Sequence, residues 1–284
     1  LLAVSFVRSP DDLKSIHSVI RDQGADIPLI AKMEKPQAAE RAAEIVDAAD
    51  SGIMIARGDL GVELPIEEVP GVQKHLIALA GRASKPAITA TQMLATMVRA
   101  SRPTRAEVTD VANAIYEEAD AVMLSGETTV GKYPVKCVEF LRRIALKSET
   151  IPGLQFAKHL RNAENKQQLA AAAVQLAEGV KAKGIVVITR RGLMADLVAN
   201  CRPFATNIYA FTNMSQPRRT MMLNRGVLPF KIDFSSDPEK TLQTAFRILK
   251  DREDFKVGDK VVIISDVLAQ QRVDSIQIRD VPSD

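Results

Sequence analysis

A unit made of a short apolar strand and a following helix recurs five times in residues 1–150, and this repetition leaves few folds open. Parallel strands covered by helices have this nearly unbroken apolar character, whereas strands with one face in water alternate apolar and polar residues. We therefore predict an α/β fold built on a parallel sheet. The expected strands are residues 1–6, 28–33, 52–56, 86–91 and 121–125.

The helices between these strands carry start signals. Ser9 is followed by Pro10 and then by Asp12, and Thr104 is followed three residues later by Glu107. Both patterns are typical of helix N-termini. The sequence predicts helices at residues 10–23, 37–48, 71–83 and 134–147, a helix behind Thr104, and a helical stretch that begins at Gln92.

Five such units are too few for a closed barrel, which needs eight units and about 250 residues. Residues 1–150 therefore form either an open sheet or the last five units of a barrel. The chain begins at Leu1 inside an apolar run, which favours a partial TIM (β/α)8 barrel of about five of the eight units. In such barrels the chemistry lies at the C-terminal ends of the strands.

Residues 151–284 are expected to form a second domain. A polar connection at residues 149–165 contains Pro152 and Gly153 and separates it from the first. An alanine-rich helix follows, and strands and helices then alternate, which predicts an open α/β sheet. The expected elements are helices at 167–183 and 238–251 and strands at 184–189, 207–212, 227–233, 260–265 and 275–281.

Composition and charge exclude several classes of function. Lys and Arg number 38 against 35 Asp and Glu, with no basic tract, so we expect no nucleic-acid partner and no membrane surface. No apolar run approaches the roughly 20 residues of a membrane span. Cys137 and Cys201 stand far apart in the sequence, which favours a reducing, cytoplasmic location without a structural zinc.

Charged side chains end two of the apolar runs. Lys32 and Glu34 lie at the end of one, and Arg57 and Asp59 follow the next. If neighbouring parallel strands bring these ends together, two carboxylates and an ammonium converge, as a hard cation and a phosphate-bearing substrate require. Taken singly, Lys32 and Glu34 could form an ordinary salt bridge, Asp59 could be a turn residue, and Thr91 could be a strand threonine.

The joint pattern is more specific than any of these residues alone. The segments IAKMEK, GIMIARGDLGVELP, KPAITATQML, RPTRAEVTDVANA and AVMLSGET, in this order and spacing, closely resemble the pyruvate kinase family. The resemblance implies phosphoryl transfer from phosphoenolpyruvate to ADP, giving pyruvate and ATP in glycolysis. It also implies Mg²⁺ or Mn²⁺ and K⁺ as cofactors, a cytoplasmic homotetramer, and a regulatory role for residues 151–284.

The resemblance also implies roles for individual residues. Glu34 and Asp59 correspond to the protein ligands of the divalent ion, and Lys32 to the cation that stabilises the phosphoryl group in flight and the enolate. The backbone amides of Gly58 and Asp59 correspond to those that hold the substrate carboxylate at a helix N-terminus. Thr91 resembles the residue near the enolate face that is linked to protonation.

The sequence departs from the family pattern at several places. Val130 stands where the family usually has a lysine that reaches the nucleotide, and Lys132 follows two places later. The resemblance further implies that the first three barrel strands and the lid domain are missing from these residues. The K⁺ ligands and a phosphate-binding arginine, which the family carries on those parts, would then be missing as well.

The second domain departs as well. At the turn 189–195, Leu193 and Met194 stand where a phosphate would need polar partners, and residues 266–274 replace a glycine-rich loop. We therefore expect that fructose 1,6-bisphosphate does not activate the protein through this turn.

Two other functions stay open on sequence grounds. A Mg²⁺-dependent aldolase or lyase acting on keto acids also holds its metal by a Glu and an Asp at adjacent strand ends. Alternatively the 284 residues are an inert fragment whose second domain only binds ligands or partners. We expect the chain alone to be catalytically silent, because strands 1–6 and 121–125 would be unpaired edges.

Overall fold

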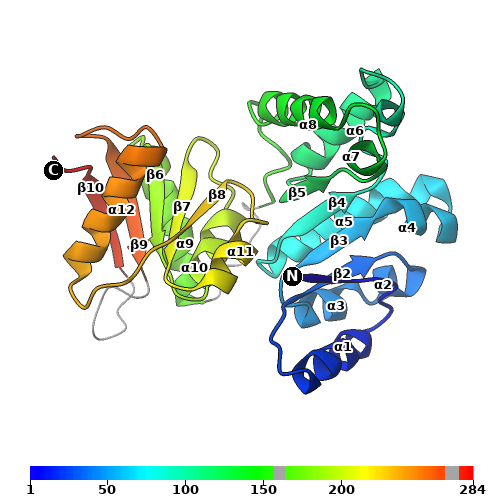
Figure 1. Cartoon of the computed structure of the whole chain (residues 1–284), viewed down its shortest axis with the longest axis horizontal. Helices are drawn as coiled ribbons and strands as arrows, with labels where there is room; N and C mark the ends of the chain where they lie inside the picture. Colours follow the sequence, from blue (N-terminus) through cyan, green and yellow to red (C-terminus); the bar gives the residue numbers. More distant parts are fainter. Residues whose placement is uncertain (157–163, 266–274, 284) are drawn as a thin grey trace. The chain divides into compact units, whose positions relative to one another are not determined.

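The computed structural model describes residues 1–156, 164–265 and 275–283, and every structural statement below concerns these residues. The chain divides into two compact units, Leu1–His159 and Leu160–Asp284. Each unit is built on its own five-stranded sheet (Figure 1). The predicted fold class, a parallel α/β sheet followed by a second α/β unit, is confirmed.

The first unit contains a fully parallel sheet in which every strand pairs with its neighbour in sequence. Its strand order is therefore β1-β2-β3-β4-β5, and β1 and β5 form the two edges of the sheet as described. Since all five strands point the same way, their C-terminal ends share one edge. The strands are Leu2–Val4 (β1), Leu29–Met33 (β2), Ile53–Ala56 (β3), Ala87–Ala90 (β4) and Ala121–Met123 (β5).

Helices follow each strand and supply the core of this unit. Buried side chains of α1, α3 and α5 pack with those of β2 and β3, and a second cluster joins α6 and α8 to the segment after β4. The α-helices are Pro10–Asp22 (α1), Pro36–Glu40 (α2), Ala42–Ala48 (α3), Arg57–Glu63 (α4), Val69–Arg82 (α5), Arg105–Tyr116 (α6), Gly126–Thr129 (α7) and Pro134–Ser148 (α8). Short 3₁₀ helices cover Ile66–Glu68 (η1) and Ala95–Val98 (η2).

Two sequence predictions in this unit are wrong in detail. The helix expected at 37–48 is interrupted at Arg41, whose φ of −104° and ψ of 24° separate α2 from α3. The helical stretch expected from Gln92 does not begin there, because Thr91 and Gln92 have φ values of 70° and 55°. Helical structure resumes only at η2.

The second unit contains a mixed sheet. Its strand order is β10-β9-β6-β7-β8, with β10 antiparallel to β9 and the other pairs parallel. The strands are Gly184–Ile188 (β6), Asn207–Thr212 (β7), Val227–Lys231 (β8), Lys260–Ser265 (β9) and Ser275–Asp280 (β10). The strands expected at 207–212 and 260–265 match β7 and β9, and the other three end one or two residues earlier than expected.

Helices cover both faces of this second sheet. The helices are Asn165–Gly179 (α9), Leu193–Asn200 (α10), Ser215–Met221 (α11) and Pro238–Arg252 (α12). Along β6, Ile185 and Val187 join the cluster with α9 and α10, whereas Val186 and Ile188 join the cluster with α12. This alternation follows from the two-residue period of a strand. In the part of the chain that the structure describes, no helix is both long and apolar enough to cross a membrane.

Gly52 shows how closely the chain is packed at the start of β3. Its φ is 96°, and a Cβ atom at this position would lie 2.0 Å from the carbonyl oxygen of Pro86. That carbonyl accepts the hydrogen bond from Ile53 N at 3.0 Å, which joins β3 to β4. The register of the sheet therefore depends on glycine at position 52.

We predict that Gly52→Ala lowers the free energy of unfolding by about 3 kcal/mol, because it combines a left-handed backbone with a steric clash. Urea denaturation followed by circular dichroism measures this. Gly71→Ala is the matched control: Gly71 lies in α5 with no atom within 4 Å of the added Cβ, so this change should stabilise slightly. Equal stability of Gly52→Ala and the wild type would contradict the packing described here.

Candidate active site

A charged pair marks the end of β2. Lys32 is the fourth residue of this strand and Glu34 follows its last residue. Lys32 Nζ forms an ion pair with Glu34 Oε1 and donates a hydrogen bond to Ser5 Oγ at 2.9 Å. The Glu34 side chain is 0% exposed and that of Lys32 is 23% exposed. The pair therefore buries its anion and leaves its cation partly accessible.

The two carboxylate oxygens of Glu34 have different environments. Oε2 accepts a hydrogen bond from Phe6 N at 2.7 Å. Oε1 is buried, faces the Lys32 ammonium and accepts no hydrogen bond of ordinary geometry. A buried carboxylate oxygen with remaining acceptor capacity is a suitable ligand for a hard cation.

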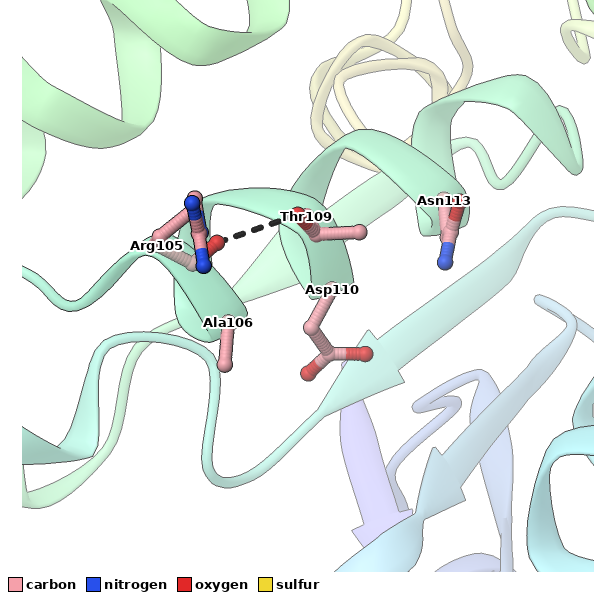
Figure 2. A pocket seen from close by; sticks show the side chains of 5 residues that line it. All are labelled: Arg105, Ala106, Thr109, Asp110 and Asn113. Atoms are coloured by element: carbon pink, nitrogen blue, oxygen red, sulfur yellow. Dashed lines mark hydrogen bonds between the residues drawn. The ribbon is translucent and has the colours of Figure 1, made fainter.

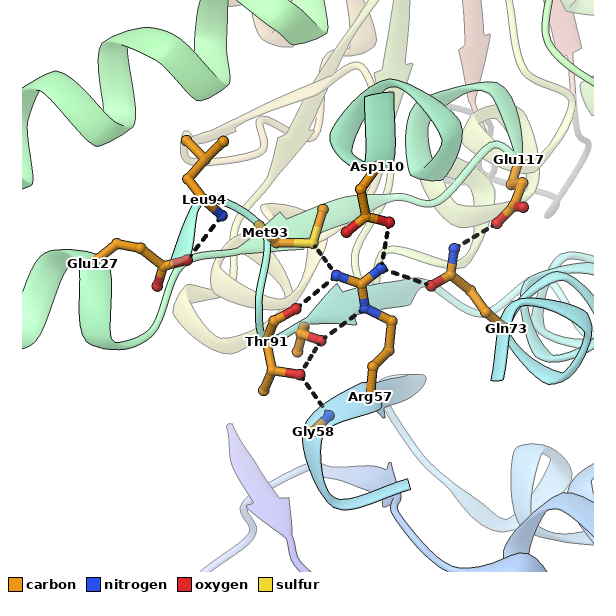
Figure 3. A network of polar contacts seen from close by, with 10 residues as sticks. Arg57, Gly58, Gln73, Thr91, Met93, Leu94, Asp110, Glu117 and Glu127 are labelled. Atoms are coloured by element: carbon orange, nitrogen blue, oxygen red, sulfur yellow. Dashed lines mark hydrogen bonds and ion pairs between the residues drawn. The ribbon is translucent and has the colours of Figure 1, made fainter. Parts of the chain in front are cut away.

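The end of β3 meets the end of β4 through Gly58 and Thr91. The helix α4 begins at Arg57, directly after β3, and Thr91 directly follows β4. Gly58 N donates to Thr91 Oγ1 at 2.8 Å, and Thr91 Oγ1 donates to Ala90 O at 2.6 Å (Figure 3). Since the Gly58 amide is engaged, a substrate carboxylate at this position would share that donor with Thr91 or displace its hydroxyl.

Asp59 lies in the first turn of α4 and is exposed. The strands β2 and β3 are neighbours, with Met33 paired to Ile55, so Glu34 and Asp59 follow adjacent strand ends. Within the described ranges no hydrogen bond or ion pair joins Asp59 to Glu34. The structure thus brings together Lys32 with Glu34 and Gly58 with Thr91, and Asp59 follows the strand next to the one that precedes Glu34.

The turn after β4 is strained. Thr91 and Gln92 both have positive φ values, of 70° and 55°. Such values are uncommon for residues other than glycine, and for a β-branched residue such as Thr91 they are outliers. Each residue in this conformation costs about 1–3 kcal/mol, so the turn persists only where surrounding contacts offset that cost.

Arg57 makes the contacts that surround this turn. Its guanidinium donates to Thr91 O at 2.6 Å, to Ala90 O at 3.4 Å and to Met93 Sδ at 2.9 Å (Figure 3). It also forms an ion pair with Asp110 of α6 at 2.7 Å, and only 10% of its side chain is exposed. One side chain at the start of α4 therefore connects three segments that are distant in sequence.

A second layer of polar groups supports Arg57. Gln73 Oε1 accepts from Arg57 Nη1 at 3.3 Å, and Gln73 Nε2 donates to Glu117 Oε2 at 2.6 Å. Burial raises the pKa of the Glu117 carboxyl, and the hydrogen bond from Gln73 opposes that shift. Gln73 is itself buried, and its amide oxygen and amide nitrogen are each held by a hydrogen bond.

Two glutamates hold the segment that follows the strained turn. Glu127, 2% exposed, accepts from Leu94 N at 3.0 Å and from Ser125 N at 2.8 Å. Glu107 accepts from Thr96 N at 2.6 Å and from Thr104 N at 2.7 Å, and it forms the predicted capping box of α6. Burial alone would raise the pKa of Glu107, but its hydrogen bonds with Thr96 and Thr104 outweigh burial and lower it.

A hollow of about 490 Å³ lies along helix α6, next to the contacts of Arg57. Figure 2 shows its lining, which comes from the single helix α6: Arg105, Ala106, Thr109, Asp110 and Asn113. Asp110 is the one residue that it shares with the Arg57 network. Because one helix supplies the whole lining, we place the candidate site at the strand ends and not in this hollow.

At the turn 189–195 of the second unit, the sequence predicts that no sugar phosphate is bound, and this stays a prediction. Gly192 has a φ of 92°, and its amide donates to Thr189 Oγ1 at 3.3 Å. Leu193 is 48% exposed, whereas Met194, the second residue of α10, is 0% exposed and belongs to the core of this unit. Met194 therefore does not face a ligand at this turn. Residues 266–274, the other part of that prediction, lie outside the described residues.

Sequence reasoning missed several contacts of the site. Ser5 and the amide of Phe6 bind the Lys32–Glu34 pair. The sequence placed both residues within the first expected strand, whereas β1 ends at Val4 and both follow it. Arg57 was noted only as a charge at a strand end. Its partners are 16 to 53 residues away in sequence, so no local pattern identifies them.

These features define a two-unit α/β protein of the barrel class, and comparisons with known proteins agree. The family model "Pyruvate kinase, barrel domain" matches residues 1–138, and "Pyruvate kinase, alpha/beta domain" matches residues 167–278. The chain belongs to the pyruvate kinase family.

Individual relatives support this membership. Pyruvate kinase isozyme G, chloroplastic, from Ricinus communis is 38% identical over 286 residues, covering 98% of this chain and 68% of the relative. Pyruvate kinase 2 from Synechocystis is 41% identical over 269 residues, covering 94% and 45%. A crystal structure of a pyruvate kinase from Cryptosporidium parvum has a TM-score of 0.91 and 32% identity, covering 99% of this chain and 58% of that one. The chain spans about half the length of several curated relatives that it matches.

We predict that Glu107 stabilises the protein above its ordinary pKa of 4.5 and that this contribution disappears as the pH falls through its lower folded pKa. Glu107→Gln should therefore be less stable than the wild type near neutral pH, and the gap should narrow in acid. Urea midpoints of both proteins between about pH 6 and pH 3 measure the gap. A gap that stays constant across this range would contradict the assigned role.

Proposed function

We propose that this chain carries the phosphoryl-transfer site of a pyruvate kinase, which converts phosphoenolpyruvate and ADP to pyruvate and ATP. The observation that carries the proposal is the assembly of Lys32 with Glu34, and of Gly58 with Thr91, at adjacent strand ends. Membership in the family supplies the reaction that such an edge would serve. We further propose a cytoplasmic homotetramer, on the family resemblance alone.

Lys32 is the cationic group of this site. Phosphoryl transfer depends chiefly on positioning and on neutralising charge, and an ammonium near the transferred group supplies both. Its ion pair with Glu34 and its hydrogen bond to Ser5 orient Nζ before substrate binds. The fixed orientation avoids reorganisation when charge develops on the phosphoryl group and on the enolate oxygen.

Glu34 and Asp59 fit a divalent cation, Mg²⁺ or Mn²⁺. The buried Glu34 Oε1 has acceptor capacity left, and Asp59 follows the neighbouring strand. Among the described residues no group of three or more His, Cys, Asp or Glu side chains could hold a metal. Two carboxylates suit Mg²⁺, which keeps several waters and binds substrate phosphates. When bound, such an ion would neutralise phosphate charge. K⁺ is proposed on the family resemblance alone.

Gly58 and Thr91 provide the remaining groups. The amides of Gly58 and Asp59 lie at the start of α4, where they could donate to the substrate carboxylate. Thr91 Oγ1 now accepts from Gly58 N and donates to Ala90 O. Binding of a carboxylate at Gly58 would free only a lone pair of Thr91 Oγ1, because the hydroxyl donates its proton to Ala90 O. The proposed role in protonating the enolate therefore requires the Thr91 hydroxyl to turn from Ala90 O toward the substrate.

The aldolase or lyase alternative has no support in the comparisons, which match pyruvate kinase domains in both units. The inert-fragment alternative concerns the 284 residues by themselves. We propose that they are silent alone, because β1 and β5 are edges of the described sheet and a barrel would pair them.

A coupled assay of ATP formation from phosphoenolpyruvate and ADP tests both proposals. It compares this chain alone with a completed enzyme, in which the part of the Synechocystis relative that this chain does not match supplies the remaining residues. We expect turnover by the completed enzyme and none by the chain alone. A folded but inactive completed enzyme would refute the proposed function, and turnover by the chain at a comparable rate would refute its predicted silence.

We predict that Lys32→Met in the completed enzyme lowers kcat by about 10²–10³-fold and changes KM much less, because the ammonium acts on charge that develops in the transition state. Steady-state kinetics with phosphoenolpyruvate measures both constants. Lys35→Met is the matched control, since Lys35 pairs with Glu63 instead. A rise in KM with unchanged kcat would make Lys32 a ground-state binding residue.

We also predict that Glu34→Gln and Asp59→Asn each weaken Mn²⁺ binding by at least about tenfold, because each removes an anionic ligand. Electron paramagnetic resonance of free Mn²⁺ during titration of the completed enzyme gives the affinity. Asp47→Asn is the control, since Asp47 lies on α3 before β3 begins, at the opposite end of the strands. Unchanged Mn²⁺ affinity in both variants would exclude this pair as the metal site.

A further inference from the structure

We propose that Arg57 is a positioning residue for the reaction, which holds the strained turn after β4 and thereby sets the places of Thr91 and the Gly58 amide. This inference rests on the proposed function. Arg57 itself lies outside the set of residues to which we assign contact with substrate, and it acts through its neighbours.

The contacts of Arg57 fall on the backbone that needs support. Its guanidinium donates to the carbonyls of Thr91 at 2.6 Å and Ala90 at 3.4 Å (Figure 3). Ala90 O also accepts from the Thr91 hydroxyl, and that hydroxyl accepts from Gly58 N. Arg57 is covalently next to Gly58, so one residue fixes both partners of the Gly58–Thr91 hydrogen bond.

The turn after β4 needs these contacts of Arg57 because its backbone is strained. Thr91 and Gln92 are consecutive residues other than glycine with positive φ, and neither has a conformational preference for that region. Such a conformation persists only where surrounding contacts impose it. Loss of the guanidinium would let the turn relax and would move the Thr91 hydroxyl away from the Gly58 amide.

Arginine suits this task better than lysine. The guanidinium presents five donors in a planar fork, whereas an ammonium is a compact point charge. Here the fork reaches two carbonyls, the Asp110 carboxylate at 2.7 Å and Gln73 Oε1 at 3.3 Å. Asp110 balances its charge, and Gln73 is held in turn by Glu117.

The test compares four variants with the wild type: Arg57→Met, Arg57→Lys, Gln92→Gly and the double variant Arg57→Met with Gln92→Gly. Gln92 is exposed, and glycine there adopts positive φ without strain. Arg41→Met is the matched control, because Arg41 forms an exposed ion pair with Glu44 on α3. Two quantities are measured: kcat/KM for phosphoenolpyruvate in the completed enzyme, and hydrogen exchange of the Gly58 and Ile53 amides by NMR in the 284-residue chain.

We expect Arg57→Met to lower kcat/KM by about 100-fold, the usual effect of misplacing reacting groups by about 1 Å, and Arg57→Lys to recover little of it. Gln92→Gly should recover about tenfold in the Arg57→Met background and change the wild type less than about twofold. Exchange at Gly58 should accelerate by more than about tenfold in Arg57→Met, while exchange at Ile53, within the β3–β4 pairing, stays unchanged.

Three results would overturn the proposal: equal acceleration at Gly58 and Ile53, which indicates general destabilisation; full recovery by Arg57→Lys; or no recovery by Gln92→Gly. If the wild-type completed enzyme makes no ATP, the proposed function fails, but the exchange rates still test the positioning role of Arg57.

Discussion

The parallel pairing of β2, β3 and β4 is the constraint on which the rest of the first unit depends. Met33 pairs with Ile55, and Ala56 pairs with Ala90, so the residues that follow these strands emerge at one edge. A one-residue slip would turn every side chain of a strand to the other face. The pairing therefore decides whether the charged residues at the strand ends meet at all, and the close approach of Gly52 to Pro86 O fixes it at the opposite end.

At this edge of the sheet, buried charges are paired and a strained turn is held by hydrogen bonds. Burying the Glu34 carboxylate would be costly without a partner, and Lys32 compensates its charge while remaining partly exposed. Arg57 is similarly compensated by Asp110, and it uses its other donors on the strained turn. The sheet thus supports two preorganised pairs, one ionic and one hydrogen-bonded, before any substrate is present. Such a site lowers the free energy of unfolding, but its polar groups then need little reorganisation during the reaction.

The sequence was informative where the signal is local. Apolar runs located the ten strands of the described residues to within about two residues, and the capping box at Thr104 located α6. The spacing of Lys32 and Glu34 correctly indicated side chains close enough to pair. The turn at Thr91 and Gln92 could not be predicted, because no glycine or asparagine marks its positive φ and distant contacts impose it. The role of Arg57 was hidden for the same reason. The break at Arg41 also lacks a local signal.

The most direct test of the account is a crystal structure of the completed enzyme with Mn²⁺ and oxalate, a planar dianion that resembles enolpyruvate. The account predicts a cation coordinated by carboxylate oxygens of both Glu34 and Asp59, with the oxalate against the amides of Gly58 and Asp59. It also predicts that the Arg57 guanidinium still contacts the Thr91 carbonyl. A cation bound elsewhere, with Glu34 and Asp59 uncoordinated, would contradict the assignment of this strand edge as the site of phosphoryl transfer.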